Sequence, residues 1–515
     1  MALRLAPAER RGASRLAAVA AGPIAVVDIG SNSGRVVVLR VSDDGHLQIV
    51  ADERAPLRLS RDLGTNGRLG DEAADRTVLA LRDFVAVARG AGAVRTVAVA
   101  TAAVREAGDR RAFVDAIRDR TGLDVEVIDG EREAAYAFLG AVHGLAVEDG
   151  LLFDIGGGSL EVTRFAHREL DRAWTLPLGA LRLSDEFLGS DPPTVDEREE
   201  LTRHVRRTLK GAGVGPLGPG ERVVGTGGTV RNLARMDARR HRSFIPHLHG
   251  YELAGGRLRT IVDQLAGRRL DRRRSMSGLN EDRADSIVGG ATAVLALLDL
   301  VGAPGLLVSG QGLREGVALT ALGISTSRPA AVRRASVAAL SARFATWDGE
   351  RARRRTEVVE RLAADLDPEA DPEQVEMLAH AATLLDLGRA VDYYDRYGQA
   401  ARTVLSGDLI GFSHRHLALL AATFLEAAGE RPGDAYRTEL TRRDRGWAAK
   451  AGAILALADE IESRTPPGET VAVSCRVRPR GVVLAAPVLA AWRPRAVGDR
   501  FRRAFRRRLV IEERP

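Results

Sequence analysis

Cysteine and lysine are scarce in this chain of 515 residues, and long apolar runs are absent. The single cysteine, Cys475, excludes an internal disulfide and any metal site built from cysteine ligands. No apolar run approaches the ~20 residues that cross a bilayer. The longest candidate, 482–492, is too short and contains Pro487. We therefore expect a globular protein that does not enter a membrane.

The first 22 residues contain Arg10, Arg11 and Arg15, followed by a weak alanine-rich stretch at 16–21. This stretch makes a poor core for a signal peptide. We expect residues 1–22 to be a flexible extension and the protein to be cytoplasmic.

Arginine supplies nearly all of the positive charge. The net charge is +7, and Lys210 and Lys450 are the only lysines. Arginine favours bidentate contacts to phosphate, although a compositional bias of the genome explains the same excess. The C-terminal run is compatible with a polyanion site or with a solvated helix face; it comprises Arg500, Arg502, Arg503, Arg506, Arg507 and Arg508.

One sequence pattern occurs twice, 126 positions apart. Asp28-Ile-Gly-Ser-Asn-Ser33 and Asp154-Ile-Gly-Gly-Gly-Ser159 each follow an apolar strand and precede a second strand. Such a turn presents several backbone N–H groups and hydroxyls at one point, which suits a phosphate group. The strand-end aspartates supply carboxylates for a metal ion. The repeat predicts two related domains that face each other across a phosphate-binding cleft.

Strands alternate with helices over two thirds of the chain, which predicts an α/β fold with a mixed sheet in each half. We expect domains at 23–142 and 143–326, with long helices at 71–88, 131–142, 185–209 and 282–300. Glycine-rich turns end strands at 28–33, 154–159, 225–229 and 309–312. From 327 to 515 the pattern is mostly helical, with strands expected at 470–477 and 481–484.

The motifs together resemble the exopolyphosphatase and guanosine pentaphosphate phosphatase family, within the actin, sugar kinase and Hsp70 superfamily. The similar segments are Val27–Ser33, Ala100–Ala107, Val127–Ala134, Asp154–Glu161, Pro177–Leu183, Gly225–Thr229 and Gly312–Gly316. The resemblance implies two duplicated actin-like (ribonuclease H-like) domains. It also implies a mostly helical C-terminal domain that resembles the His-Asp (HD) metal phosphohydrolase fold.

The resemblance implies that Glu133 acts as a general base, which aligns the water that attacks the terminal phosphorus. Arg105 matches the family's arginine that neutralises charge on the phosphate oxygens. From the residues alone, Glu133 is equally a first-turn glutamate favoured by the helix dipole, and Arg105 a surface arginine.

The resemblance also implies a Mg²⁺ site and a phosphate site. The carboxylates matching the metal side are Asp154 and Glu161, with Asp28 as a third candidate. For Asp28 and Asp154 the alternative is a turn cap, and for Glu161 it is a solvated strand face. The residues matching the phosphate site are Ser31, Asn32, Ser33, Gly157, Gly158, Ser159, Gly227, Gly228, Thr229 and Arg58.

The chain departs from the family pattern in three places. Leu59-Ser-Arg-Asp62 replaces Leu-Gly-Glu-Gly beside the cleft, and Gly34 replaces an often larger side chain. In the helical domain, Leu384-Leu-Asp386 lacks the histidine of the HD motif, and His414 and His416 do not share a helix face. We therefore expect no metal there and interpret this domain as a packing or substrate-holding module.

The leading hypothesis is a Mg²⁺-dependent exopolyphosphatase, which releases terminal phosphate from inorganic polyphosphate. The close alternative is a guanosine pentaphosphate (pppGpp) 5′-phosphohydrolase, and a sugar or carboxylate kinase fits Glu133 and Arg105 less well. A non-catalytic sensor of (p)ppGpp or polyphosphate is the alternative from another class. The family suggests a homodimer, and nothing in the sequence requires nucleic acid as a partner.

Overall fold

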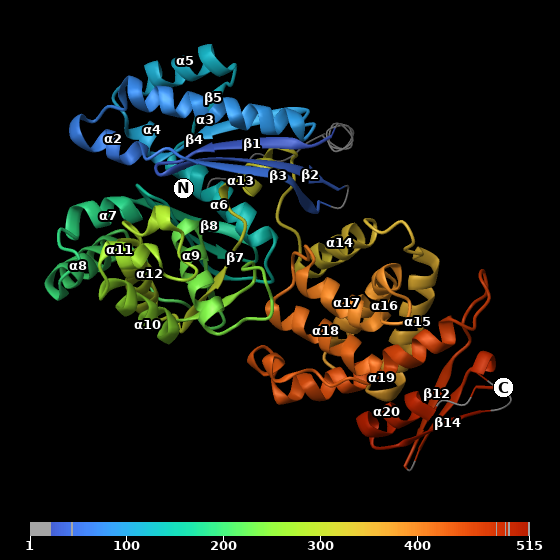
Figure 1. The fold of residues 1–515 in the computed structure, drawn as a ribbon. Helices are drawn as coiled ribbons and strands as arrows, with labels where there is room; N and C mark the ends of the chain where they lie inside the picture. The colour runs from blue at the N-terminus through green and yellow to red at the C-terminus, as the bar shows by residue number, and fades with distance from the viewer. Residues whose placement is uncertain (1–21, 43–44, 480, 490, 493–494, 513–515) are drawn as a thin grey trace. The chain divides into compact units, whose positions relative to one another are not determined.

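The computed structural model describes residues 22–512 except 43–44, 480, 490 and 493–494. The predicted extension at 1–22 lies almost entirely outside the described residues. The chain divides into two compact units, shown in Figure 1. The first comprises the residues up to Ser243 and Leu248–Val332, and the second comprises Phe244–His247 and Arg333–Pro515. The helical unit thus begins at Arg333, six residues after the predicted boundary, and both predicted α/β domains belong to one unit.

The first half of the α/β unit, lobe I, contains a five-stranded sheet in the order β3-β2-β1-β4-β5. Its strands are β1 (Ile24–Ile29), β2 (Ser33–Val41), β3 (Leu47–Pro56), β4 (Arg95–Ala100) and β5 (Val125–Val127). β2 runs antiparallel to β1 and β3, whereas β4 and β5 run parallel to β1. The covering helices are α2 (Leu59–Asn66), α3 (Gly70–Gly90), α4 (Ala102–Glu106) and α5 (Arg110–Thr121).

The second half, lobe II, repeats this arrangement in a six-stranded sheet, β10-β11-β9-β6-β7-β8. Its strands are β6 (Gly150–Ile155), β7 (Leu160–Ala166), β8 (Glu169–Leu176), β9 (Arg222–Thr226), β10 (Glu252–Ala254) and β11 (Gly305–Val308). The helices are α7 (Ala180–Phe187), α8 (Val195–Gly211), α9 (Gly227–Arg240), α10 (Gly255–Ala266), α11 (Leu270–Arg274) and α12 (Ile287–Val301), with a 3₁₀ turn η1 at Glu281–Arg283. Buried aliphatic side chains of the strands and helices form one core.

The helical stretch predicted at 185–209 is not one helix. The structure has two helices, α7 and α8, because Pro192 and Pro193 interrupt the pattern between them. Thr194 then caps α8 by accepting a hydrogen bond from the N–H of Glu197, whose carboxylate accepts one from the N–H of Thr194. Likewise, the helix predicted at 282–300 begins only at Ile287, after η1.

Two helices exchange places between the lobes. α6 (Gly130–His143) follows lobe I in the chain, yet Phe138, Ala141 and Val142 pack in a core with the lobe II sheet. Conversely, α13 (Leu313–Ala321) ends lobe II but packs on β1 and β2 of lobe I. The predicted boundary at 142/143 therefore divides the sequence but does not describe where these helices pack.

The helical unit consists of a helical bundle with a small sheet at its end. Its helices are α14 (Pro329–Ser341), α15 (Gly349–Leu366), α16 (Pro372–Val391), α17 (Arg396–Ser406), α18 (His414–Ala428), α19 (Arg442–Glu462) and α20 (Arg495–Phe505). β12 (Ser474–Arg478), β13 (Gly481–Ala485) and β14 (Arg508–Ile511) form the sheet in the order β12-β13-β14. The run of arginines at 500–508 thus spans the end of α20 and the start of β14.

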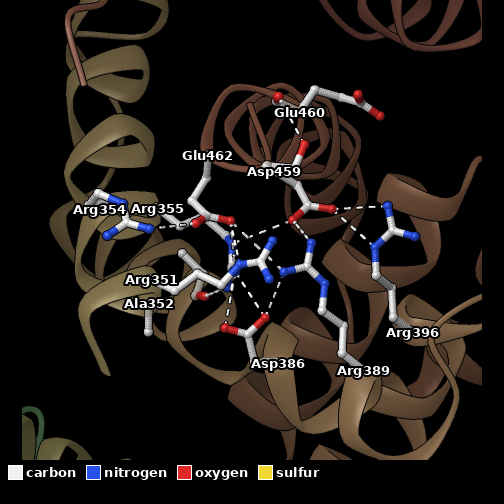
Figure 2. A network of polar contacts seen from close by, with 12 residues as sticks. Arg351, Ala352, Arg354, Arg355, Asp386, Arg389, Arg396, Asp459, Glu460 and Glu462 are labelled. Atoms are coloured by element: carbon white, nitrogen blue, oxygen red, sulfur yellow. Dashed lines mark hydrogen bonds and ion pairs between the residues drawn. The ribbon is translucent and has the colours of Figure 1, made fainter. Parts of the chain in front are cut away.

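Asp386, the aspartate that the sequence analysis compared with the HD motif, lies in a buried network of charges (Figure 2). Arg355 of α15 is fully buried and donates hydrogen bonds to both carboxylate oxygens of Asp386, at 2.9 and 3.1 Å. Arg389 bonds both Asp386 and Asp459, which links α16 to α19. The Asp386 carboxylate is therefore paired with the guanidinium groups of Arg355 and Arg389. No helix of the described residues combines the length and apolarity of a membrane span.

Candidate active site

The two repeated turns face each other, as the repeat predicted. Each has the same internal hydrogen bond, from Gly30 N–H to Ser33 O at 3.3 Å and from Gly156 N–H to Ser159 O at 3.0 Å. A Cβ atom on Gly157 would lie 3.3 Å from the Cβ atom of Ser31. Glycine at this position lets the two turns approach to van der Waals distance, so their N–H groups line one site.

Strand register places charged side chains beside both turns. Asp28 pairs with Arg35 across β1 and β2, and Asp154 pairs with Glu161 across β6 and β7. Because the hairpins are equivalent, Arg35 occupies in lobe I the position that Glu161 occupies in lobe II. At equivalent positions, lobe I therefore presents the guanidinium group of Arg35 and lobe II the carboxylate of Glu161.

A cavity lies between the two turns. It is lined by both turns and by the starts of α6, α9 and α13. The lining residues are Asp28, Gly30, Ser31, Asn32, Ser33, Arg35, Thr101, Glu133, Asp154, Ile155, Gly156, Gly157, Gly158, Ser159, Glu161, Thr226, Gly227, Gly228, Arg231, Arg283, Gly312, Leu313, Arg314 and Glu315. Most of the predicted site residues thus meet in one place.

Glu133 lies in the first turn of α6, whose N-terminus is capped by Asp129. Its carboxylate accepts a hydrogen bond from Arg105 Nη1 at 2.8 Å, and the same nitrogen donates to Ile128 O at 3.0 Å. Arg105 is therefore held against Glu133 and is not the free surface arginine of the alternative reading. Burial raises the pKa of Glu133 to about 7, although Arg105 opposes the shift.

Glu161 is buried and Asp28 and Asp154 are half-buried, and none of these three predicted metal-side carboxylates is bonded to a cation of the described residues. Asp28 Oδ1 and Glu161 Oε1 have no hydrogen-bond partner, and Glu161 is only 2% exposed, which excludes a solvated strand face. Neither Asp28 nor Asp154 bonds to its own loop among the described hydrogen bonds, so neither caps its turn. Burial raises the pKa of Asp28 to about 6 and also raises that of Asp154 and Glu161.

This donor set fits a hard divalent cation. Mg²⁺ prefers oxygen ligands and keeps several waters, so one or two carboxylates with substrate oxygens suffice. Among the described residues no group of three or more acidic, histidine or cysteine side chains is already arranged around a metal position. A cation here would therefore be held jointly by protein and substrate.

Four arginines that the sequence analysis did not single out line the same cavity: Arg35, Arg231, Arg283 and Arg314. None of their guanidinium groups has a hydrogen bond or ion pair among the described residues. Burial lowers the pKa of Arg35 to about 9 and that of Arg283 to about 10, and mutual repulsion adds to both shifts. A group of half-buried and buried guanidinium groups without a protein partner gives this cavity the chemistry of an anion site.

Sequence signals for these arginines were available in part. Arg35 lies opposite Asp28 in the predicted hairpin, Arg231 lies two residues after Gly225–Thr229, and Arg314 lies inside Gly312–Gly316. Arg283 had no such signal. Its guanidinium lies against Gly228, close enough that any Cβ atom at position 228 would overlap with it.

Three predicted residues do not line the cavity. Arg105 lies behind Glu133, and Thr229 is 1% exposed beneath the N-terminus of α9. Arg58 is exposed and precedes α2 with a left-handed backbone (φ 57°), outside the cavity lining. Gly34 leaves space that Leu57 and Phe84 fill, since a Cβ atom there would lie 3.0–3.1 Å from them.

The fold and the site define a two-lobed, actin-like phosphohydrolase. The model of the Ppx/GppA phosphatase family matches residues 37–324, more than half of the chain. The chain is 30% identical over 318 residues to exopolyphosphatase 1 of Mycobacterium tuberculosis, covering 61% of this chain and 92% of that protein. Exopolyphosphatase 2 of the same organism is 31% identical over 315 residues (58% and 98%).

Solved structures agree. An exopolyphosphatase from Cytophaga hutchinsonii superposes with a TM-score of 0.55 at 29% identity, covering 59% of this chain and 99% of that one. The Ppx/GppA family member of Aquifex aeolicus gives 0.52 at 28% identity (58% and 97%). The chain belongs to the Ppx/GppA phosphatase family and is a hydrolase. Apart from Phe244–His247, the helical unit lies outside the matched range 37–324.

Proposed function

We propose that the protein is an exopolyphosphatase that hydrolyses the terminal phosphoanhydride bond of inorganic polyphosphate. The observation that carries this proposal is the position of Glu133, bonded to Arg105 and beside two facing phosphate-type turns. Ser31, Asn32 and Ser33 on one turn and Gly157, Gly158 and Ser159 on the other hold the terminal phosphate. Glu133 accepts a proton from the attacking water while Arg105 holds its carboxylate in place.

A divalent cation, Mg²⁺ in this proposal, is held by Asp154 and Glu161, with Asp28 on the facing strand. When bound, it neutralises charge on the phosphate oxygens of the transition state. The N-terminus of α9 at Gly227 and Gly228 points N–H groups toward the next phosphates.

The four unpaired arginines support a substrate with several phosphates. Arg35, Arg231, Arg283 and Arg314 match a chain of charges longer than one phosphoryl group. None of the described residues that line the cavity is an aromatic that would stack on a purine, which favours polyphosphate over pppGpp. We further propose that the helical unit is an HD-like module without its metal, that the protein is a homodimer, and that it works in the cytoplasm.

The test compares orthophosphate release from long-chain polyphosphate and from pppGpp, with Mg²⁺, by wild type and Glu133→Gln. We expect polyphosphate to be preferred and the variant to lose about 10²–10⁴-fold in kcat, because the amide cannot accept the proton. Preference for pppGpp would instead identify the protein as a pppGpp 5′-phosphohydrolase. Binding without any release would contradict hydrolysis and leave the sensor hypothesis.

A further inference from the structure

The segment Leu59-Ser-Arg-Asp62, one of the departures from the family pattern, lies at the edge of the cavity. It begins α2, and the backbone N–H of Ser60 donates to the carbonyl of Ser31 in the phosphate turn. Ser60 Oγ also lies 3.7 Å from where a Cβ atom on Gly158 would be. Arg61 is therefore one residue away from the point where the two turns meet.

Arg61 bonds across the cleft to lobe II. Its Nη2 donates to Asp285 Oδ2 at 2.7 Å. The neighbouring Asp62 pairs with Arg76 of α3, whose Nε also bonds the carbonyl of Leu57, and this fixes α2 on its own lobe. Held in this way, α2 directs Arg61 toward the opposite lobe.

A second ion pair crosses the cleft beside the first. Arg54 of β3 donates to Asp282 Oδ2 at 3.3 Å, and its Nε is buried without a partner. Both acidic partners flank Arg283, which lines the cavity. Arg54 is close enough to Arg35 and Arg283 to lower the pKa of each. The two ion pairs therefore adjoin the arginine-lined side of the cavity.

These pairs are weak enough to exchange. The side chains of Arg61 and Asp285 are 40% and 26% exposed, and access to water weakens an ion pair of this kind. Asp185 of α7 also lies near Arg61 and Asp285. Partial burial raises the pKa of Asp185, the positive charge of Arg61 opposes this rise, and the negative charge of Asp285 adds to it. A phosphate oxygen offers a charge-assisted hydrogen bond at least as strong as a carboxylate.

We propose that Arg54 and Arg61 form an exchangeable gate at the cleft mouth. A linear phosphate chain that extends beyond the cavity replaces Asp282 and Asp285 as the partner of these arginines. The two arginines are then residues that select for long chains, whereas the two aspartates compete with the substrate. This inference rests on the proposed polyphosphate substrate.

The gate requires that loss of Arg61 and loss of the Asp285 charge change KM in opposite directions, and the experiment tests this. KM and kcat for orthophosphate release are measured with long-chain polyphosphate and with tripolyphosphate, for wild type, Arg61→Gln and Asp285→Asn. We expect Arg61→Gln to raise KM for the long chain about tenfold, because a charged hydrogen bond is lost. Asp285→Asn frees Arg61 and lowers the same KM about threefold. The effects of both substitutions on the KM for tripolyphosphate are smaller.

Arg120→Gln is the matched control, because Arg120 pairs with Asp75 at 2.6 Å on the surface of lobe I alone. If the ion pair only holds the two lobes together, Arg61→Gln and Asp285→Asn should shift KM in the same direction, since both substitutions break the pair. That result, or no shift beyond the control, overturns the gate. If the wild-type protein releases no orthophosphate, the proposed function is wrong, but the gate is still tested by binding. The dissociation constant of labelled long-chain polyphosphate is then compared across the same variants, where absent binding or same-sign shifts also overturn the gate.

Discussion

At the scale of single residues, the site brings together acidic and basic side chains that form no ion pair with one another among the described residues. Glu133 is the exception, because Arg105 is bonded to it. Burial raises the pKa of Glu133 to about 7, and the positive charge of Arg105 limits this rise. A base whose pKa lies near the working pH is well suited to accept a proton from water.

This arrangement predicts the pH dependence of the reaction. Glu133 must be deprotonated to act as a base, so kcat should rise with pH and level off above about 7. Arg105→Met removes the nearby positive charge, which should move the rising limb about one unit or more to higher pH. The measurement is the pH profile of kcat for both proteins.

Arg118→Met is the control for this profile, since Arg118 is exposed on lobe I and pairs with Asp115. It should leave the rising limb in place. A limb that does not move in Arg105→Met would show that Arg105 does not set the protonation of Glu133.

At the scale of elements, the crossing of α6 and α13 positions Glu133. The helices touch through Gly140 and Gly316, where a Cβ atom would overlap with the carbonyl oxygens of Gly312 and Tyr136. Since α6 carries Glu133 and α13 begins at the cavity wall, their separation sets the width of the site.

Gly316→Ala should therefore force the two helices apart. We expect a loss of about 1–3 kcal/mol in the free energy of unfolding, with a fall in kcat, because the overlap is with backbone atoms that cannot rotate away. Urea denaturation and orthophosphate release measure the two effects.

Gly256→Ala is the matched control. Gly256 lies in α10, and nothing is within 4 Å of a Cβ atom built there. Because alanine is the better helix former, this variant should be neutral or stabilised by up to ~1 kcal/mol. Equal losses in both variants would show that close packing at Gly316 is not the cause.

At the scale of the whole molecule, the two units are stabilised in different ways. The α/β unit has apolar cores around a charged cavity, whereas the helical unit has charges inside its core. Five arginines meet three carboxylates there (Figure 2): Arg351, Arg354, Arg355, Arg389 and Arg396 with Asp386, Asp459 and Glu462. Loss of one carboxylate leaves several buried guanidinium groups without compensation.

Asp459→Asn should destabilise the helical unit by about 3–5 kcal/mol, because Asp459 contacts Arg355, Arg389 and Arg396. Urea unfolding followed by tryptophan fluorescence reports this unit, which contains three of the four tryptophans. Arg353→Ala, at an exposed position of α15, should change stability by less than ~0.5 kcal/mol. A loss in Asp459→Asn no larger than that would contradict a structural role for the network.

The sequence by itself determined the parts of this protein that depend on local pattern. The duplicated Asp-Ile-Gly turns, the alternation of strands and helices, and the position of Glu133 just after a strand were readable because period and turn chemistry are local properties. The break between α7 and α8 was readable in principle from Pro192 and Pro193, but the apolar spacing on both sides concealed it.

Only the tertiary structure decided which distant residues share the cavity. Arg35, Arg231, Arg283 and Arg314 come from four separate segments, and the motifs beside three of them do not show that all four meet in one cavity. The crossing of α6 and α13, the exposure of Arg58 and the pairing of Arg61 with Asp285 also depend on how the two lobes pack. Local pattern specifies the elements, but electrostatics and close packing act through space, and the partners they bring together are set by the fold.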